Sequence, residues 1–364
     1  MSLKEISSAG VSVWLDDLSR ERMRRGGKSS YLPDLIEDSH VVGVTTNPAI
    51  FSAAIANSDL YRDDVVKEHR SGKGAEEIIT ALTTADVRSA CQLFLPTYES
   101  TDGVDGRVSI EVDPRLARDT ETTISQAREL WEIVDMPNVL IKVPATREGI
   151  PAIRRLIADG ISVNVTIIFS VARYREVLDA FVSGLEDRME RNLPISDIHS
   201  VASFFISRVD TEIDAQLDAM KIGSLRGKAA LANARLAYEH FLEVEGSSRW
   251  RKLSEKGARI QRPLWASTGV KDPAYDPTMY VVELVAEKTV NTMPESTLNA
   301  VRVSDTFTGN TILGRFEDSK LVLQSLQDHG IDIDVVAEKL EREGIEKFIK
   351  PWLELIEVVK KAAV

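Results

Sequence analysis

The sequence predicts an α/β fold: a single (β/α)8 TIM barrel with additional helices. Short apolar runs of strand length alternate with helical patterns along almost the whole chain, which favours parallel strands joined by right-handed crossovers. Eight such runs occur, the number that closes this barrel. The alternative is a doubly wound open sheet. Neither G-x-G-x-x-G after the first run nor a Walker sequence is present, which disfavours a nucleotide-binding sheet of that kind.

The predicted strands are apolar and rich in branched residues, and polar or turn-forming residues bound them. The eighth is the least apolar. They are Val11–Asp16, Val41–Thr46, Arg107–Asp113, Val139–Ala145, Ser162–Ser170, Ser200–Ile206, Pro263–Thr268 and Lys288–Met293.

Helical patterns fill most of the segments between these runs. The predicted helices are Leu18–Arg25, Leu116–Val134, Pro151–Ala158, Ala172–Arg191, Asp210–Met220, Lys228–Val244 and Pro277–Glu287. We expect a helical insertion over about 52–106 and a helical extension over about 316–364 that packs on the barrel. In the extension, Asp334 is the predicted N-cap, Gly344 a break and Ile345–Lys361 the last amphipathic helix. No flexible linker or repeat divides residues 1–364, so one domain is predicted.

Composition limits the classes of function. The chain has 364 residues, and 45 Lys and Arg against 57 Asp and Glu give a net charge of −12. This excess of acid disfavours a nucleic-acid or membrane partner. The single cysteine, Cys91, excludes an intrachain disulfide and a thiolate metal cluster. The N-terminus lacks a signal pattern and no apolar run is long enough to span a membrane, so a cytoplasmic protein is predicted.

Lys142 interrupts the apolar run Val139–Val143. A strand buried on both faces of a parallel sheet is normally apolar throughout, and a buried ammonium group is costly. One explanation is a buried ion pair or a misplaced strand boundary. The other is an amine that burial keeps uncharged, free to attack a carbonyl and form a Schiff base.

Polar side chains also end the other predicted strands, at the face where TIM barrels carry their active sites. Capping of the following helix is the alternative explanation for each of them. Glu111 fits that alternative least, because it lies inside an apolar run. The candidates are Asp16, Thr45, Asn47, Glu111, Asn164, Thr166, Ser203, Phe205, Arg208, Ser267 and Lys271.

The chemistry of this set is coherent with a Schiff-base lysine. Asp16 and Glu111 are candidate acid and base groups, and Thr166 is placed to position a water. Thr45, Asn47, Asn164, Ser203 and Phe205 are candidate substrate contacts, and the polar ones suit sugar hydroxyls. Arg208, Ser267 and Lys271 are candidate phosphate ligands. No metal is predicted, because the five histidines have no zinc-ligand spacing.

Several motifs resemble those of the transaldolase family, in its order and spacing. GVTTNPAIF (Gly43–Phe51) resembles its first signature, and VLIKVPATREGIPAIRRL (Val139–Leu156) resembles its lysine signature. The other matching segments are VWLDDLSR, SIEVDPRLA, NVTIIFS and SFFISR. The resemblance covers roughly Val11 to Arg315, and QRPLWASTGVKDPAY and NTMPESTLNAV are similar to the longer bacterial type.

The resemblance implies a class I enzyme without metal or organic cofactor. Such an enzyme transfers a dihydroxyacetone unit from sedoheptulose 7-phosphate to glyceraldehyde 3-phosphate, in the non-oxidative pentose phosphate pathway. Erythrose 4-phosphate and fructose 6-phosphate are the products. By position, Lys142 corresponds to the Schiff-base lysine, Asp16 and Glu111 to the acid/base carboxylates, and Thr166 to the water-positioning threonine. Asn47, Asn164 and Ser203 correspond to hydroxyl contacts, and Arg208 to a phosphate contact.

Departures from the family pattern bear on the phosphate ligands and on the rival functions. Phe204 and Ser207 replace a common proline and glycine, and ASTGVK differs from the arginine-bearing version of shorter relatives.

One rival is a fructose 6-phosphate aldolase, which releases free dihydroxyacetone. Such relatives carry tyrosine where Phe205 stands. A rival from another class is a non-catalytic sugar-phosphate-binding barrel. For the C-terminal helix, a homodimer contact is the alternative to packing on the barrel.

Overall fold

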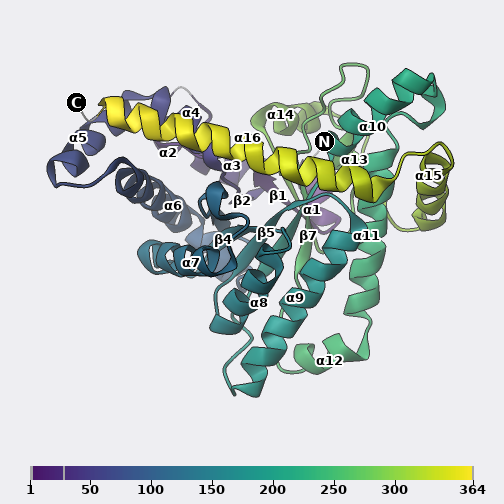
Figure 1. The fold of residues 1–364 in the computed structure, drawn as a ribbon, viewed down its shortest axis with the longest axis horizontal. Coiled ribbons are helices and arrows are strands. Elements are labelled where there is room, and N and C mark those ends of the chain that lie inside the picture. The colour runs from purple at the N-terminus through teal and green to yellow at the C-terminus, as the bar shows by residue number, and fades with distance from the viewer. Residues whose placement is uncertain (1–2, 28, 363–364) are drawn as a thin grey trace.

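A computed structural model describes residues 3–27 and 29–362 of the chain. Eight parallel strands close into a barrel in chain order, each hydrogen-bonded to the next and β8 to β1 (Figure 1). This confirms the predicted fold class. The strands are β1 (Val11–Leu15), β2 (Val41–Val44), β3 (Arg107–Glu111), β4 (Val139–Pro144), β5 (Val163–Ile168), β6 (Ser200–Phe205), β7 (Arg262–Ala266) and β8 (Thr289–Met293).

The register of the strands brings three polar residues to one level. Glu111 pairs with Lys142 between β3 and β4, and Lys142 pairs with Asn164 between β4 and β5. Because neighbouring residues at one level of a barrel face the same side, these side chains converge on the interior.

The helices surround the strands and extend beyond them. Side chains that accept from backbone N–H groups begin several of them, such as Asp119 before α7 and Ser170 before α9. Those near the first strands and in the 52–106 segment are α1 (Leu3–Ser8), α2 (Arg20–Met23), α3 (Leu32–Ser39), α4 (Pro48–Ala56), α5 (Arg62–Arg70) and α6 (Ala75–Ser100). The later ones are α7 (Thr120–Val134), α8 (Gly149–Asp159), α9 (Val171–Glu190), α10 (Ser207–Met220), α11 (Ala229–Glu245), α12 (Ser248–Ser254), α13 (Met279–Val282), α14 (Glu295–Val303), α15 (Phe316–Asp328) and α16 (Ile333–Ala362).

Two predicted helices are much shorter than expected. The helix predicted at Pro277–Glu287 is only α13, since Leu284 O accepts from the Trp265 indole (3.0 Å) and Val285 N donates to Thr311 (2.9 Å). The helix predicted at Leu18–Arg25 is only α2, which the Ser19 side chain caps. Neither α3 nor α14 was predicted.

The C-terminal extension corrects two further predictions. Gly344 does not break the helix. Helix α16, which has 30 residues in all, runs through it. Asp334 is not the N-cap, because Asp332 Oδ1 accepts from the backbone N–H of Asp334 (2.8 Å). The intrinsic cost of glycine in a helix is about 1 kcal/mol, which the packing of a long amphipathic helix outweighs.

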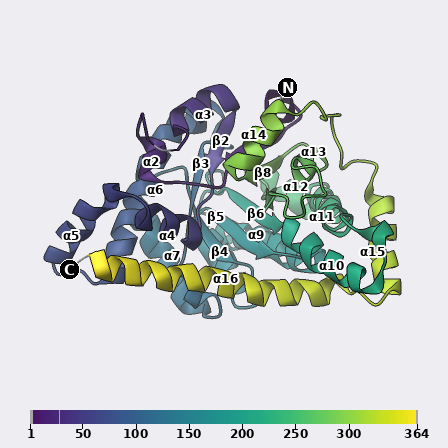
Figure 2. The same cartoon turned by 90° about the horizontal axis from the view of Figure 1, so that it is seen from above.

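Helix α16 runs across the face of the barrel that the carboxyl ends of the strands reach (Figures 1 and 2). Lys339 on this helix pairs with Glu212 of α10 (2.7 Å), and Arg173 of α9 pairs with Glu341 (3.5 Å). Gly344 faces Phe169 and Arg208, so the helix lies directly over the polar strand ends. The extension therefore packs on the barrel, as expected.

Substituting Gly344 with alanine is expected to stabilise the protein. An added Cβ would lie 3.7 Å from Arg208 and Phe169, an ordinary contact, and alanine is the better helix former by about 1 kcal/mol. Thermal unfolding should shift upward by about 1 °C for a chain of this length. The matched control is Gly184→Ala in α9. There a Cβ would lie 2.6 Å from Arg154 O of α8, so the unfolding temperature should fall. A decrease in the first variant as large as in the second would contradict this view of Gly344.

Candidate active site

A cavity of about 220 Å³ opens at the carboxyl ends of the strands. Ten of the twelve site residues predicted from the sequence line it; the other two, Glu111 and Asn164, pair in register with Lys142. The ten are Asp16, Thr45, Asn47, Lys142, Thr166, Ser203, Phe205, Arg208, Ser267 and Lys271.

Lys142 projects from β4 with a buried side chain. Its Nζ lies 3.3 Å from Glu111 Oε2 and donates to the carbonyl oxygen of Thr46 (2.9 Å). The buried ion pair, offered above as an alternative to a Schiff-base amine, is therefore present. The two explanations are compatible, because Nζ is also at the wall of an open cavity.

Both candidate carboxyl groups have a raised pKa. Burial raises the pKa of Glu111, and the positive charge of Lys142 opposes the change. Burial likewise raises the pKa of Asp16, against the lowering effects of Lys142 and of the hydrogen bond from Thr45 Oγ1 (2.7 Å). Two carboxyl groups held closer to neutrality than usual beside one amine suit proton transfer.

A chain of hydrogen bonds crosses the barrel beneath the cavity. Ser203 Oγ donates to Asn164 Oδ1 (2.7 Å), and Asn164 Nδ2 donates to Ser109 Oγ (3.0 Å). The Asn164 amide is completely buried and bonded on both its atoms, so it orients Ser203 from below.

Thr166 differs from Asn164 in its hydrogen bonding. Its buried hydroxyl has no hydrogen-bond partner among the described residues. The next residue, Ile167, has φ +56°, where the β4–β5 ladder ends and the β5–β6 register shifts. A branched residue in this region is strained, and the bulge redirects the strand immediately after Thr166. An unpaired hydroxyl on a constrained backbone is suited to bind a water or a substrate atom.

Two aromatic rings hold Arg208. Its guanidinium carbon lies 5.4 Å from the Phe205 ring centroid and 5.9 Å from that of Phe348 on α16. Its Nη1 is buried without a hydrogen-bond partner among the described residues. A guanidinium over two rings, with an N–H group unpaired among the described residues and Lys271 on the same cavity, suits an anion.

Two other predicted residues also have structural roles. Asn47 Oδ1 accepts from Ile50 N (3.0 Å) and so caps α4, as the capping explanation proposed, while the residue still lines the cavity. Ser267, at φ +55°, lies 3.0 Å from Ser207 Oγ.

Three residues at the site were not singled out from the sequence. Thr292 of β8 is 2.6 Å from Thr45 Oγ1, and Ser207 contacts Ser267. Phe348 comes from a helix more than 130 residues beyond Arg208 in the chain. The polar strand end TVNTM contained a signal for Thr292. The sequence contained no such signal for Phe348, which is a buried phenylalanine on an amphipathic helix.

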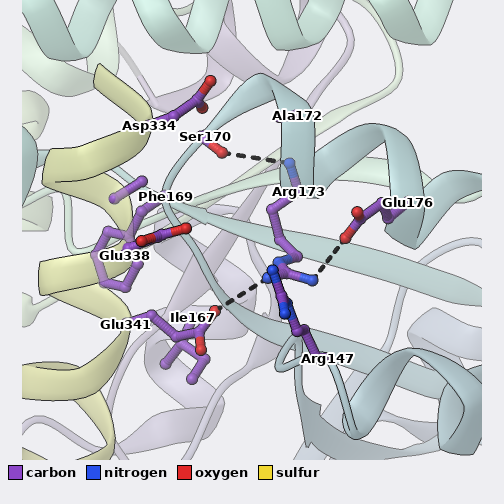
Figure 3. Close-up of a pocket in the computed structure, with 11 residues that line it drawn as sticks. Arg147, Ile167, Phe169, Ser170, Ala172, Arg173, Glu176, Asp334, Glu338 and Glu341 are labelled. Atoms are coloured by element: carbon purple, nitrogen blue, oxygen red, sulfur yellow. Dashed lines mark hydrogen bonds and ion pairs between the residues drawn. The ribbon is translucent and has the colours of Figure 1, made fainter. Parts of the chain in front are cut away.

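A neighbouring cavity of about 260 Å³ lies between α16 and the start of α9 (Figure 3). There Arg173 pairs with both Glu176 (2.5 Å) and Glu341 (3.5 Å), and Arg147 lines the same cavity. Acidic side chains of α16 face these two arginines. This charged contact fixes the helix beside the candidate site.

Among residues 3–27 and 29–362, no three His, Cys, Asp or Glu side chains are grouped so that they would hold a metal ion. In the same part of the chain, no helix is both long and apolar enough to cross a membrane.

Known proteins match this chain over nearly its whole length. The family model described as transaldolase/fructose-6-phosphate aldolase matches residues 13–359. The chain belongs to this family. A transaldolase of Mycolicibacterium smegmatis is 57% identical over 99% of this chain and 96% of its own length. Transaldolases of Thermobifida fusca (53%) and Mycobacterium tuberculosis strain H37Rv (54%) each match 98% of this chain and at least 95% of their own. The resemblance inferred from the motifs is confirmed.

Within this transaldolase-type site, Phe348→Ala is expected to raise KM for fructose 6-phosphate by up to about tenfold, the loss of one desolvated cation–π contact. Because Phe348 holds Arg208 rather than the reacting atoms, kcat should change by about twofold at most. Steady-state kinetics would measure both constants. Phe348→Tyr should restore KM, and Leu353→Ala, an exposed position on the same helix, should leave it unchanged. An unaltered KM in Phe348→Ala would rule out this contribution of α16.

Proposed function

We propose that the chain is a transaldolase, a transferase that moves a dihydroxyacetone unit between phosphorylated sugars through a lysine Schiff base. The donor is sedoheptulose 7-phosphate and the acceptor glyceraldehyde 3-phosphate. The observation that supports this most directly is a buried lysine amine between a carboxylate and an open polar cavity. The names of the full-length relatives agree with it.

The arrangement suggests a division of work. Lys142 Nζ attacks the ketose carbonyl carbon, and Glu111, 3.3 Å away, transfers protons as the carbinolamine loses water. Asp16, which lines the same cavity, takes the proton from the sugar hydroxyl on the carbon that becomes the aldehyde of the leaving aldose when the carbon–carbon bond breaks. The aldose leaves and a three-carbon enamine stays on Lys142. Addition of the acceptor aldehyde reverses these steps.

The remaining site residues would orient the sugar. Thr166, with its free hydroxyl, would hold the water that links a carboxylate to the imine. Asn47 and Ser203 would contact sugar hydroxyls, with Thr45 positioning Asp16 and Asn164 supporting Ser203. Arg208 and Lys271 would bind the phosphate, assisted by Ser267.

The second candidate is the aldolase reaction, in which water protonates the enamine and dihydroxyacetone is released. Phe205 argues against it, because its ring packs against Phe169 and Arg208 and has no hydroxyl to activate a water.

Borohydride trapping tests the proposal. Incubation with fructose 6-phosphate and borohydride, followed by peptide mapping, should show a reduced three-carbon adduct on Lys142. Transfer to erythrose 4-phosphate distinguishes a transaldolase from an aldolase, which would release free dihydroxyacetone. An adduct on another lysine, or none in a folded sample, would refute the assignment.

Homodimer formation, a cytoplasmic location and the absence of a cofactor remain predictions from the sequence. Size-exclusion chromatography with light scattering would test the first.

A further inference from the structure

A separate cavity of about 270 Å³ lies at the opposite end of the barrel, where the strands begin. We call it the basal cavity. Arg107 and Arg262 at the starts of β3 and β7 line it, together with His199 and Lys288, which directly precede β6 and β8. The proposed catalytic steps use none of these residues.

The cationic groups of the basal cavity outnumber their carboxylate partners. Arg259 pairs with Asp102, Lys288 with Glu245, and Arg262 with Asp105 (3.0 Å). The fourth cation, Arg107, has no carboxylate within ion-pair distance among the described residues. In a chain with a net charge of −12, this is a local excess of positive charge.

Arg107 is almost completely buried. Its Nε donates to Gly103 O (2.8 Å), its Nη1 donates to Pro137 O (3.2 Å), and its guanidinium lies 4.8 Å from the Tyr98 ring centroid. Burial, together with the charge of Arg262, lowers its pKa to about 10, so the group is still charged at neutral pH. A buried charge that contacts carbonyl oxygens and an aromatic ring, with no carboxylate partner among the described residues, favours a nearby anion.

The pKa of His199 is affected by the same local excess of positive charge. Burial and the charges of Arg107, Arg259 and Arg262 lower its pKa to about 2. The imidazole is therefore neutral and has one N–H group to donate. A neutral N–H donor among guanidinium groups suits an anion.

The rest of the wall is apolar. Leu140, Val201, Trp250, Ala258 and Ile260 supply it. The volume of the basal cavity is slightly below about 300 Å³, the lower end of the usual range for small-molecule pockets. This limits the ligand to a small body. The combination of an apolar wall with forked, planar guanidinium donors matches a ring or branched chain that carries a carboxylate.

We propose that the basal cavity binds a small organic carboxylate with an apolar body. Its carboxylate would lie against Arg107 and Arg259, and its body against Trp250 and Ile260. The site is independent of the proposed catalytic function and stands or fails separately from it.

Fluorine NMR with 4-fluorobenzoate as the probe tests this site in the full chain. The probe should show saturable line broadening, and 4-fluorobenzamide, its neutral counterpart of similar shape, should bind at least about tenfold more weakly. Arg259→Gln should weaken the binding of 4-fluorobenzoate by about tenfold. Arg259 is partly exposed, so its loss does not disturb the core. Ala258→Phe, which fills the cavity, should abolish binding.

Two controls separate this site from other cationic surfaces. Arg154→Gln removes an arginine from a comparable surface ion pair, and Lys271→Gln removes a cation from the catalytic cavity. Both should leave 4-fluorobenzoate binding unchanged. Equal binding of the amide, no binding of the carboxylate, or loss of binding in Lys271→Gln with retention in Arg259→Gln would each overturn the proposal. If Ala258→Phe does not fold, the Arg259 comparison still decides.

Discussion

Replacing Lys142 with methionine is expected to lower kcat by on the order of 10⁴-fold or more, with loss of the borohydride-trapped adduct. Methionine is similar in length and apolar, so it fits the buried position on β4, but it has no nucleophile to form the imine. Removing the amine also leaves Glu111 without its ion-pair partner. Circular dichroism would verify that the barrel remains folded.

The matched control for this substitution is Lys271→Met. Lys271 lines the same cavity but lies outside the strands, and we assign it to the phosphate rather than to the imine. This variant should keep the adduct on Lys142 and should mainly raise KM. Retention of full activity in Lys142→Met would refute the Schiff-base mechanism, whatever the behaviour of the control.

The second large effect is expected from the two carboxyl groups. Glu111→Gln and Asp16→Asn should each lower kcat by about 10²–10⁴-fold, the usual contribution of a general acid or base. If the division of work proposed above holds, Glu111→Gln slows formation of the adduct, whereas Asp16→Asn still forms it and slows carbon–carbon cleavage. Rapid-quench trapping with borohydride would distinguish the two.

The pH profile of kcat/KM checks the same assignment. A base must be ionised to act, and burial raises the pKa of Asp16 above 3.8 and that of Glu111 above 4.5. Activity should therefore be lost on the acidic side at a higher pH than ordinary carboxyl groups would give. Substituting the group responsible should move or remove that limb. An acidic limb that neither variant alters would assign the titration to another group.

The positions of the strands were predictable because the pattern of side chains within each run is enough to indicate a strand. Branched apolar runs such as Val139–Val143 have few alternatives to a buried strand, and each predicted run overlaps its observed strand. Helices whose ends depend on distant partners were not predictable in this way. The backbone of Leu284 and Val285 bonds to Trp265 and Thr311, which lie far from them in the chain or across a loop.

The site was predictable to the extent that its residues lie on strands. Position at the carboxyl ends of predicted parallel strands places Asp16, Lys142 and Thr166 at one end of a barrel without knowledge of any contact. Whether a polar group is free or already bonded cannot be inferred in that way. Asn164 and Thr166 share a strand face, yet the first is bonded on both amide atoms and the second has no hydrogen-bond partner within residues 3–27 and 29–362.

Helix α16 has a consequence for the order in which this protein matures during translation. It follows all eight strands in the chain, yet it supplies Phe348 and covers Phe169 and Arg208. A nascent chain that has completed the barrel but not this helix would expose these aromatic and cationic groups at an unclosed mouth. Such an intermediate would hold Lys142 and its carboxylates in place while lacking one side of the anion site. A chain still on the ribosome would therefore form the proposed catalytic groups before it completes the proposed anion site.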